Sequence, residues 1–479
     1  MQIQCGFRLF IVLLASVIYN SVLLGQSIPW FALNGHDAVK TILINPAFQF
    51  EDKMKSSIQV GTILMDYANN FGYFKDQRFI SLPFNISSIS VPELQLKNDG
   101  SNPAIGLERD VVGYELKLNP SNSNKIFFST QISYGGPGCI RVFKNGFSAG
   151  VISGMEFHGG VNDFPQQTTY NAYRNYREGN TIEIPLWNLL GYGYFYAGLY
   201  GAKVFNINEK GKLSVGINTK YLGGLTYMAL ENAEPIDKYT FGKDEDVIVS
   251  NLLLKYSYTH GSDADIRSSI IKGNGVGTDL GIYYAQKTSS KLITHFSGGI
   301  SIKNLGFIKF NSSLRYGALE INEDTGINFS QIDSTKSLDQ FVDSVHVILN
   351  TKPLNRYSQS LGKTIFIPAE LNVLLNADIS TYAGLHVFFG VPLSRISPDA
   401  IQFGFVPELK LDKVNIMVPF SYNQFTGFKL GAGINLDFLT FGTDDIRSFF
   451  KRDKLESGSI YFGVNVRKFE KIQKKKKNI

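Results

Sequence analysis

The sequence predicts an all-β protein, a transmembrane antiparallel β-barrel of about 14 strands. Segments of strand length that alternate apolar with small or polar residues recur along most of the 479-residue chain. After an apolar leader, no segment reaches the roughly 18 uninterrupted apolar residues that a membrane helix needs. Only 18% of the residues are charged, against about 25% in typical soluble domains. Together these observations favour a sheet whose outer face contacts lipid.

The clearest strand is FKLGAGINLDF, which covers residues 428–438. Successive side chains of a strand point to opposite faces, so this segment has one apolar face and one small or polar face. The apolar face holds Phe428, Leu430, Ala432, Ile434, Leu436 and Phe438; the other holds Lys429, Gly431, Gly433, Asn435 and Asp437. The same alternation recurs in 212–222 and 459–467. We therefore expect one lipid-facing stripe that is repeated around a wall.

Residues 1–26 predict a secretory signal peptide. Arg8 precedes the apolar run LFIVLLASVIYNSVLLG, and Gln26 follows it. A charged start, an apolar core and small residues at the end are typical of such a leader, and cleavage near Gln26 is favoured over a retained membrane anchor. Cys5 lies in this leader, which leaves Cys139 as the one cysteine of the mature chain and predicts no intramolecular disulfide.

Strand candidates follow one another along 56–469, the predicted barrel domain. They are 56–64, 111–118, 125–134, 147–157, 191–205, 212–227, 247–260, 275–287, 291–302, 305–321, 364–375, 381–393, 401–411, 413–422, 428–437, 438–443 and 459–469. Several of these runs exceed ten residues, whereas the strands of soluble sandwiches average about 5–6. Their length favours a membrane barrel over a soluble all-β protein, which is the alternative fold.

Two segments interrupt this series of strands. Residues 228–246 are mostly polar and acidic and predict a loop. Residues 322–362 contain SLDQFVDSVHVILN, whose apolar residues recur at helical spacing after a capping box, so we expect a short helix in a long loop. Barrels place long loops outside the cell. To put 322–362 outside and the chain end in the periplasm, the segment 427–443 must be two strands joined by a turn near Asp437.

One motif invites a catalytic interpretation. GFSAG (146–150) matches the nucleophile elbow with Ser148 as nucleophile, and His158 is a conceivable base. The elbow requires a strand, a strained turn and then a helix, but the following VISGMEF predicts a strand. We therefore expect no enzyme, and a barrel-borne lipid hydrolase is the remote alternative.

No pattern in the sequence indicates a cofactor, a metal or a nucleic acid. The histidines show no i, i+4 pair and no H-E-x-x-H motif; they are His36, His158, His260, His295, His346 and His386. The glycine-rich GNGVG (273–277) lacks the full dinucleotide fingerprint. The net charge of +6 comes from lysines at the end of the chain, chiefly in the basic tail 470–479, so a nucleic-acid partner is not expected.

Several blocks resemble a known family. NPAF at 45–48 resembles the start of Bacteroidota outer-membrane barrels, and KLSVGINTKYLGGL (212–225) resembles a strand of a large domain-of-unknown-function family in that phylum. Residues 278–310, 337–345 and 364–375 resemble its later blocks. Such proteins are similar to long-chain fatty-acid transporters (FadL-like) and to barrels associated with type 9 secretion. The resemblance implies a place in the lipid of the bacterial outer membrane and carries over no catalytic residues.

The resemblance also implies a role for the N-terminal segment 27–55. By itself, Asn-Pro marks a turn before the first strand. By analogy with fatty-acid transporters, 27–50 would fold into the lumen as a hatch that includes Asn45, Pro46, Ala47 and Phe48. We expect a barrel that binds or transports a hydrophobic small molecule. The alternative is a structural or secretion-associated barrel that anchors a periplasmic or secretion-system protein.

Overall fold

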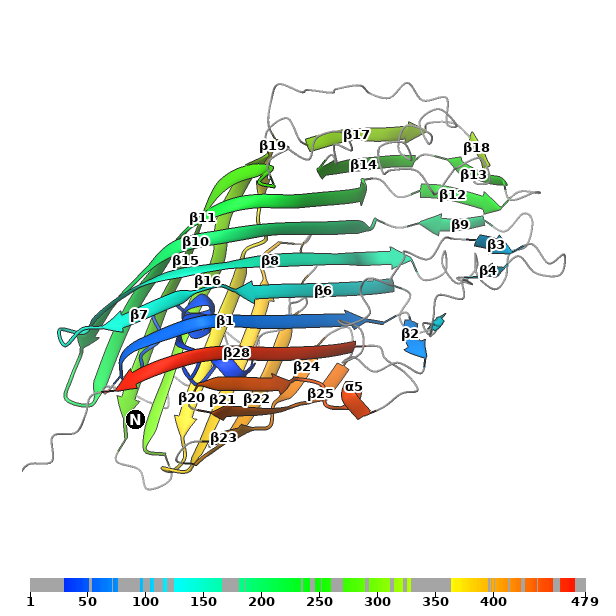
Figure 1. Ribbon diagram of the computed structural model, residues 1–479. Coiled ribbons are helices and arrows are strands. Elements are labelled where there is room, and N and C mark those ends of the chain that lie inside the picture. Colours follow the sequence, from blue (N-terminus) through cyan, green and yellow to red (C-terminus); the bar gives the residue numbers. More distant parts are fainter. Residues whose placement is uncertain are drawn as a thin grey trace, which may run out of the picture.

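The alternating segments form one continuous antiparallel sheet in the computed structural model of the protein (Figure 1). The sheet closes on itself because β1 (Met54–Asn69) pairs with β28 (Ser457–Phe469) on one side and with β6 (Lys125–Gly135) on the other. Closure leaves β1 without a free edge along most of its length, as a spanning barrel requires.

The structure describes most of the wall and the segment inside it. The described residues are 30–50, 54–70, 72–75, 95–97, 104–106, 115–118, 125–165, 181–184, 186–233, 236–241, 246–250, 252–259, 270–288, 293–310, 314–321, 325–328, 363–394, 397, 399, 401–411, 414–423, 427–436, 438–450 and 457–469. The predicted signal peptide, the predicted helix in 337–350 and the tail 470–479 lie outside these residues.

Twenty labelled strands make up the wall. In six places two labels follow each other along one wall strand, so the wall has 14 strands, as predicted. The labels, in chain order, are β1 (Met54–Asn69), β6 (Lys125–Gly135), β7 (Gly138–Val142), β8 (Phe147–Pro165), β10 (Asn188–Asn206), β11 (Gly211–Asn232), β14 (Leu252–Thr259), β15 (Gly273–Lys287), β16 (His295–Phe310), β17 (Leu314–Ile321), β19 (Lys363–Phe366), β20 (Glu370–Asp378), β21 (Ala383–Pro392), β22 (Gln402–Lys410), β23 (Val414–Met417), β24 (Phe420–Asn423), β25 (Gly427–Leu430), β26 (Ala432–Leu436), β27 (Leu439–Thr443) and β28 (Ser457–Phe469).

Three small sheets lie apart from the wall. One has four strands, and the other two have two each. Their members are β9 (Thr181–Ile184), β12 (Ile236–Phe241), β13 (Asp246–Ser250) and β18 (Thr325–Asn328); β2 (Gly72–Lys75) and β5 (Glu115–Leu118); and β3 (Gln95–Lys97) and β4 (Ala104–Gly106). The described helices are η1 (Trp30–Ala32), α2 (Ala38–Ile44) and α5 (Arg447–Phe450). Within the described residues, none of the helices has the length and apolar character needed to cross a membrane.

The alternation in the sequence sorts the wall into two faces. Phe428 is 79% exposed, whereas its neighbour Lys429 is 4% exposed. On β11, Val215 and Ile217 are exposed and Asn218 is fully buried. The predicted stripe is thus confirmed: apolar side chains face outward, where lipid covers a membrane barrel, and small or polar ones face the lumen.

The predicted turn near Asp437 also agrees with the pairing. β26 ends at Leu436, β27 begins at Leu439, and the two pair as antiparallel neighbours. The segment 427–443 therefore forms two wall strands. Asp437 itself lies outside the described residues.

Four strand or loop assignments were wrong. The runs 247–260 and 275–287 were predicted as two strands, but β14 and β15 both pair with β11 and follow each other along one wall strand. The segment 111–118 was predicted as a wall strand, but its described part, β5, pairs with β2 outside the wall. The segment 228–246 was predicted as a loop, yet β11 continues to Asn232 and β12 follows. The runs on either side of 303–304 belong to the single strand β16, which bulges there opposite Asp279 because Asn304 adopts a φ of 59°. Alternation cannot tell which sheet a strand joins, which explains the error at 111–118, and the polar composition of 228–246 concealed a strand outside the wall.

The wall is taller on one side than on the other (Figure 1). β8, β10 and β11 have 19, 19 and 22 residues, whereas β21 and β22 have 10 and 9. Short turns join strands at the end where β1 begins and β28 finishes, for example between Asn206 and Gly211. We call this end the turn end, and the opposite end, where the longer connections lie, the loop end.

Candidate functional site

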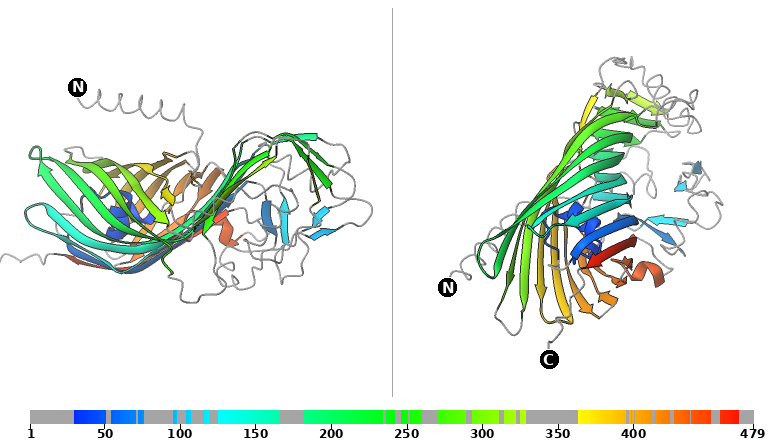
Figure 2. Two further views of the ribbon diagram at one scale, coloured as in Figure 1. Left: turned by 90° about the horizontal axis from the view of Figure 1, so that it is seen from above. Right: turned by 60° about the vertical axis from the view of Figure 1, so that its left-hand side comes forward.

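The N-terminal segment, residues 30–50, lies inside the wall. All residues of η1 and α2 are buried, and Figure 2 shows the dark-blue helix between opposite sides of the barrel. The sequence favours this short helix because Asp37 caps it, accepting a hydrogen bond from Lys40 N at 3.1 Å. Burial raises the pKa of the Asp37 carboxyl and lowers the pKa of the Lys40 amine.

Polar side chains from four wall strands hold this segment. The contacts are Asn218 Nδ2 to Ile42 O at 2.8 Å, Ser301 Oγ to Ile44 O at 2.6 Å, Lys40 Nζ to Ser133 Oγ at 2.8 Å, and Tyr461 Oη to Asp37 Oδ2. Two of these bonds satisfy carbonyls at the end of α2 that have no helical partner. The segment is therefore fixed to several sides of the lumen.

Wall glycines make room for the segment. A Cβ at Gly433 would lie 1.6 Å from Phe31 Cε1, and one at Gly216 would lie 2.1 Å from Pro46 O. Gly433 belongs to the small or polar set that the sequence placed opposite the lipid stripe. Because Gly433 faces inward and has no side chain, the N-terminal segment can approach the wall closely there.

The four residues predicted for a hatch lie together at the end of α2. Asn45, Pro46, Ala47 and Phe48 are all buried. Asn45 Oδ1 accepts a hydrogen bond from Ala47 N at 2.9 Å, which forms a tight Asx turn, and Asn45 Nδ2 donates to Ile282 O at 3.4 Å. That these residues act as a hatch stays a prediction.

Buried charged side chains surround the segment within the lumen. Lys220 Nζ lies 2.6 Å from Asp279 Oδ2, and Lys303 Nζ lies 3.0 Å from Glu370 Oε2. Such pairs are rarely strong sources of stability, because both charges leave water. Their effect here is to make the middle of the lumen polar.

Ser148 and His158 are not brought together. Both lie on β8, ten residues apart, a separation of roughly 33 Å along a strand. No helix follows Ser148, so the nucleophile elbow is not formed. His158 instead contacts Glu156 and Asp399, each at 3.4 Å. The arrangement gives no support to the hydrolase alternative.

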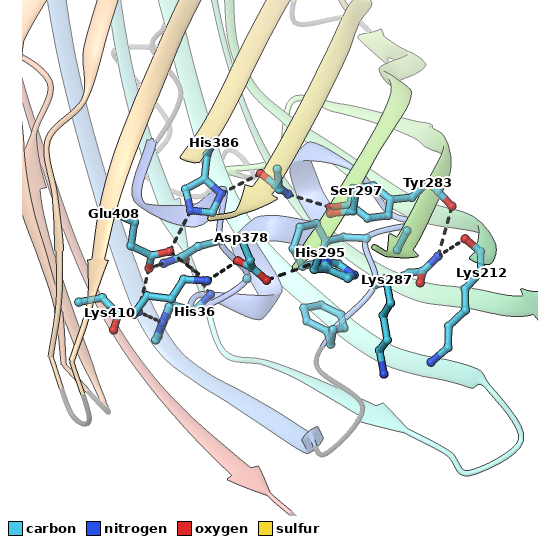
Figure 3. Close-up of a pocket in the computed structure, with 18 of the residues that line it drawn as sticks. His36, Lys212, Tyr283, Lys287, His295, Ser297, Asp378, His386, Glu408 and Lys410 are labelled. Atoms are coloured by element: carbon cyan, nitrogen blue, oxygen red, sulfur yellow. Dashed lines mark hydrogen bonds and ion pairs between the residues drawn. The ribbon is translucent and has the colours of Figure 1, made fainter. Parts of the chain in front are cut away.

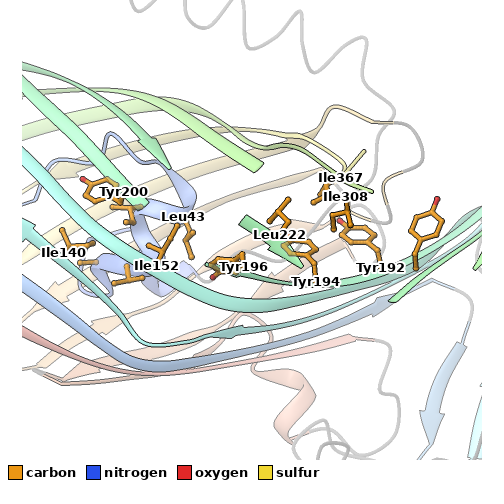
Figure 4. Close-up of a cluster of buried hydrophobic side chains, with 14 of the residues drawn as sticks. Leu43, Ile140, Ile152, Tyr192, Tyr194, Tyr196, Tyr200, Leu222, Ile308 and Ile367 are labelled. Carbon is orange, nitrogen blue, oxygen red and sulfur yellow. The ribbon is translucent and has the colours of Figure 1, made fainter. Parts of the chain in front are cut away.

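An aromatic cluster lines the lumen toward the loop end. Tyr192, Tyr194 and Tyr196 project to the same side of β10 in Figure 4. They belong to a buried apolar cluster that also holds Tyr227 and Phe310. A small apolar cavity of about 20 Å³ lies among Tyr192, Tyr227 and Phe310. These tyrosines were not predicted as site residues, although their period of two in GYGYFYAG (191–198) indicates one aromatic face.

A cavity of about 740 Å³ lies at the turn end, beside the N-terminal segment (Figure 3). Its lining combines residues of the segment with residues of eight wall strands, β11, β15, β16, β20, β21, β22, β23 and β28. Its lining includes Asn34, His36, Phe48, Gln49, Phe50, Glu209, Lys210, Lys212, Tyr283, Lys287, Ser297, Asn376, Asp378, His386, Glu408, Lys410 and Arg467. We call this space the turn-end cavity.

A chain of hydrogen bonds crosses one side of the turn-end cavity. Its links are Ser297 Oγ with Tyr283 Oη at 2.8 Å, Asn376 Nδ2 to Tyr283 Oη at 2.7 Å, Asn376 Oδ1 with His386 Nδ1 at 2.8 Å, His386 Nε2 with Glu408 Oε2 at 2.9 Å, and Asn34 Nδ2 to Glu408 Oε1 at 2.6 Å. The last bond joins the wall to the N-terminal segment. The Glu408 carboxylate is therefore fully engaged by neighbours.

Comparison with known proteins gives one family and several distant structures. A model of a family of unknown function, DUF5723, matches residues 46–444. No curated protein matches the chain.

Solved structures with a similar course of the chain have low identity. The toluene transporter TodX from Pseudomonas putida is 8% identical, with a TM-score of 0.34, and the match covers 89% of this chain and 92% of that one. The translocator domain of the autotransporter NalP from Neisseria meningitidis is 9% identical, with a TM-score of 0.32 and coverage of 90% and 93%. A FadL homologue from Pseudomonas aeruginosa is 8% identical, with a TM-score of 0.21 and coverage of 89% and 93%. With every TM-score below 0.5, no function is carried over from these proteins.

Proposed function

This chain belongs to the family of unknown function DUF5723, and we propose that it is an outer-membrane barrel that binds and transports a hydrophobic small molecule. The closed wall of 14 strands with apolar side chains outside points to the outer membrane. The N-terminal segment acts in this proposal as the plug of the lumen.

The observation that carries the proposal is the aromatic cluster in the lumen. Polar side chains are sufficient to line a lumen that passes only water and ions. Buried tyrosines on one face of β10 therefore favour an apolar ligand. Tyr192 and Tyr194 stack with ring centroids 6.2 Å apart, and Tyr227 and Phe310 approach to 6.0 Å. Rings in this arrangement bind apolar ligands with large contact area. The cluster is thus the binding site for the apolar ligand on the loop-end side of the plug.

Binding of a fluorescent apolar probe to the purified barrel tests this proposal. Naphthalene is expected to bind the wild type, and Tyr192→Ala is expected to weaken binding about tenfold, the equivalent of one lost aromatic contact of about 1.4 kcal/mol. The matched control is Tyr221→Ala, because Tyr221 is exposed on the outer face of β11. Equal affinity in all three proteins, or no binding to the wild type, would contradict the proposal.

A second candidate is the structural or secretion-associated barrel. The four-stranded sheet of β9, β12, β13 and β18 supports it, because this sheet assembles from separate connections beyond the wall and offers a partner a folded surface. A protein that copurifies with the barrel and is lost when residues 470–479 or this sheet are removed would favour the second candidate.

A further inference from the structure

We propose that the turn-end cavity is a binding site for a small anionic molecule, one that carries a carboxylate or phosphate group on a ring. This site is separate from the aromatic cluster, because the N-terminal segment lies between them. Its volume of about 740 Å³ is in the range of sites for small ligands, roughly 300–1,000 Å³.

The charge of the lining favours an anion. Five cationic side chains line the cavity, against three carboxylates: Lys210, Lys212, Lys287, Lys410 and Arg467, against Glu209, Asp378 and Glu408. Two of the three carboxylates are already engaged on the β20–β22 side, where Asp378 meets Lys410 and Glu408 meets His386 and Asn34. By position, the lining residues of the opposite side include Lys210, Lys212 and Lys287 against Glu209, so the excess of positive charge lies there, at β11, β15 and the turn before β11.

Three lysines come together on that opposite side. Lys212 on β11 pairs with Ala285, so Lys287 on β15 is its diagonal neighbour, about 7–8 Å away between Cα atoms. Lys287 N also donates to Lys210 O at 2.9 Å, which fixes the turn beside the strand. Figure 3 shows the side chains of Lys212 and Lys287 extended next to each other in the same direction. Two lysine side chains that extend side by side from neighbouring strands can offer their ammonium groups to one oxyanion.

An aromatic surface adjoins these lysines. The ring of Phe48 lies 5.1 Å from that of Tyr283 and 5.4 Å from that of Phe50, centroid to centroid. Gln49 fixes this part of the segment by donating to Lys212 O at 3.2 Å and to Tyr283 O at 3.3 Å. A ligand with its anionic group at the lysines can thus place a ring against Phe48 and Phe50.

The contributions of the anionic group and of the ring can be separated by measuring the binding of four probes to the full-length barrel in neutral detergent. Phenyl phosphate and benzoate carry both features, phenol has the ring alone, and inorganic phosphate has the charge alone. We expect phenyl phosphate and benzoate to bind at least tenfold more tightly than phenol and more tightly than inorganic phosphate, with affinity that falls as salt is added. If inorganic phosphate binds as tightly as phenyl phosphate, the role of the ring is refuted. If phenol binds as tightly as phenyl phosphate, the anion site is refuted.

Variants locate the site. The double variant Lys212→Gln/Lys287→Gln is expected to raise the Kd for phenyl phosphate at least tenfold. The matched control is Lys144→Gln, because Lys144 is an exposed lysine in a turn at the same end and does not line the cavity. Equal weakening in the control, or no weakening in the double variant, would overturn the assignment. Heat-dependent gel mobility verifies that each variant is a folded barrel.

Stability gives an independent readout. A ligand that contacts both Phe48 of the segment and Lys287 of the wall stabilises the folded, plugged state by mass action. Phenyl phosphate is therefore expected to raise the Tm of the wild type and of Lys144→Gln but not that of the double variant. Neither measurement uses naphthalene or the aromatic cluster, so the proposed transport function and this anion site can fail separately.

Discussion

At the scale of single residues, the lumen of this barrel is shaped by positions that lack a side chain. Gly433 and Gly442 both approach the ring of Phe31, and Gly404 approaches Trp30. Because Phe31 and Trp30 are almost fully buried, neither ring has free space into which it can move. These glycines are therefore where the fit between wall and N-terminal segment can be tested.

Gly433→Val is expected to destabilise the protein by about 1–3 kcal/mol, the usual effect of overpacking a filled site. The added Cβ would lie 1.6 Å from Phe31 Cε1, so the segment must shift. A lower Tm and faster proteolysis of the N-terminal segment are the measurements. Gly201→Val is the control, because a Cβ at Gly201 has nothing within 4 Å. A Gly433→Val protein as stable as the control would contradict this close fit.

His36 predicts a dependence on pH. Burial, followed by the charge of Arg467, lowers the pKa of His36 from 6.5 to about 3. The contact agrees with a neutral ring, since Arg467 Nη2 donates to His36 Nδ1 at 2.6 Å. Between pH 6.5 and about 3, His36 therefore carries a proton in the unfolded chain but not in the folded protein. The contribution of His36 to stability is therefore complete above pH 6.5 and falls as the pH drops toward 3.

The test compares wild type with His36→Gln, whose side-chain oxygen can still accept from Arg467 but does not titrate. Lowering the pH from 7 to 5 is expected to cost the wild type about 2 kcal/mol more than the variant, which is seen as a larger drop in Tm. Identical pH profiles for the two proteins would show that His36 is already accessible to protons in the folded state.

At the scale of the strand, a period of two separates lipid from lumen. On β11 the exposed Ile217 alternates with the buried Asn218, which donates to Ile42 O of the N-terminal segment. The same strand thus presents apolar side chains outward and contacts the N-terminal segment with its other face. This explains how the wall accommodates so many polar residues behind an apolar outer face.

Ile217→Arg places a charge on the lipid face of β11. The expected loss is about 2–4 kcal/mol if the residue is near the bilayer midplane, and less near either interface. Urea unfolding in lipid vesicles measures it, and Ile217→Val is the conservative control. A soluble protein would accept this exposed arginine without loss, so an unchanged unfolding curve would argue against the membrane assignment.

At the scale of the whole molecule, we expect the closed wall and the buried N-terminal segment together to determine permeability. The wall alone encloses a lumen, and residues 30–50 occupy it with contacts to β6, β11, β16 and β28. The polar pairs beside the segment, Lys220 with Asp279 and Lys303 with Glu370, would line a water-filled channel once the segment was absent.

Deleting residues 30–50 while residues 1–29 are kept is expected to open the channel to ions. Planar-bilayer recordings should show steady conductance for the deletion variant and little for the wild type. The variant's gel mobility before and after heating serves as the control for folding, since a folded barrel migrates differently from the unfolded chain. A folded deletion variant without conductance would show that other residues also close the lumen.

The alternation of residues, by itself, determined the all-β class, the count of wall strands, the outward stripe of Phe428 and Ile434, and the break between β26 and β27. It could do so because the face of a strand residue depends only on its local position. It failed for β5 and β12, whose pairing outside the wall depends on distant partners.

Only the tertiary structure decided what the inward residues meet. Asn34 and Glu408 are 374 positions apart, yet they share a hydrogen bond. Lys212 and Lys287 join Phe48 in one cavity only because the wall closes and the N-terminal segment enters it. A period of two in the sequence predicts that a residue faces inward. Closure of the sheet determines which other residue lies opposite it across the lumen.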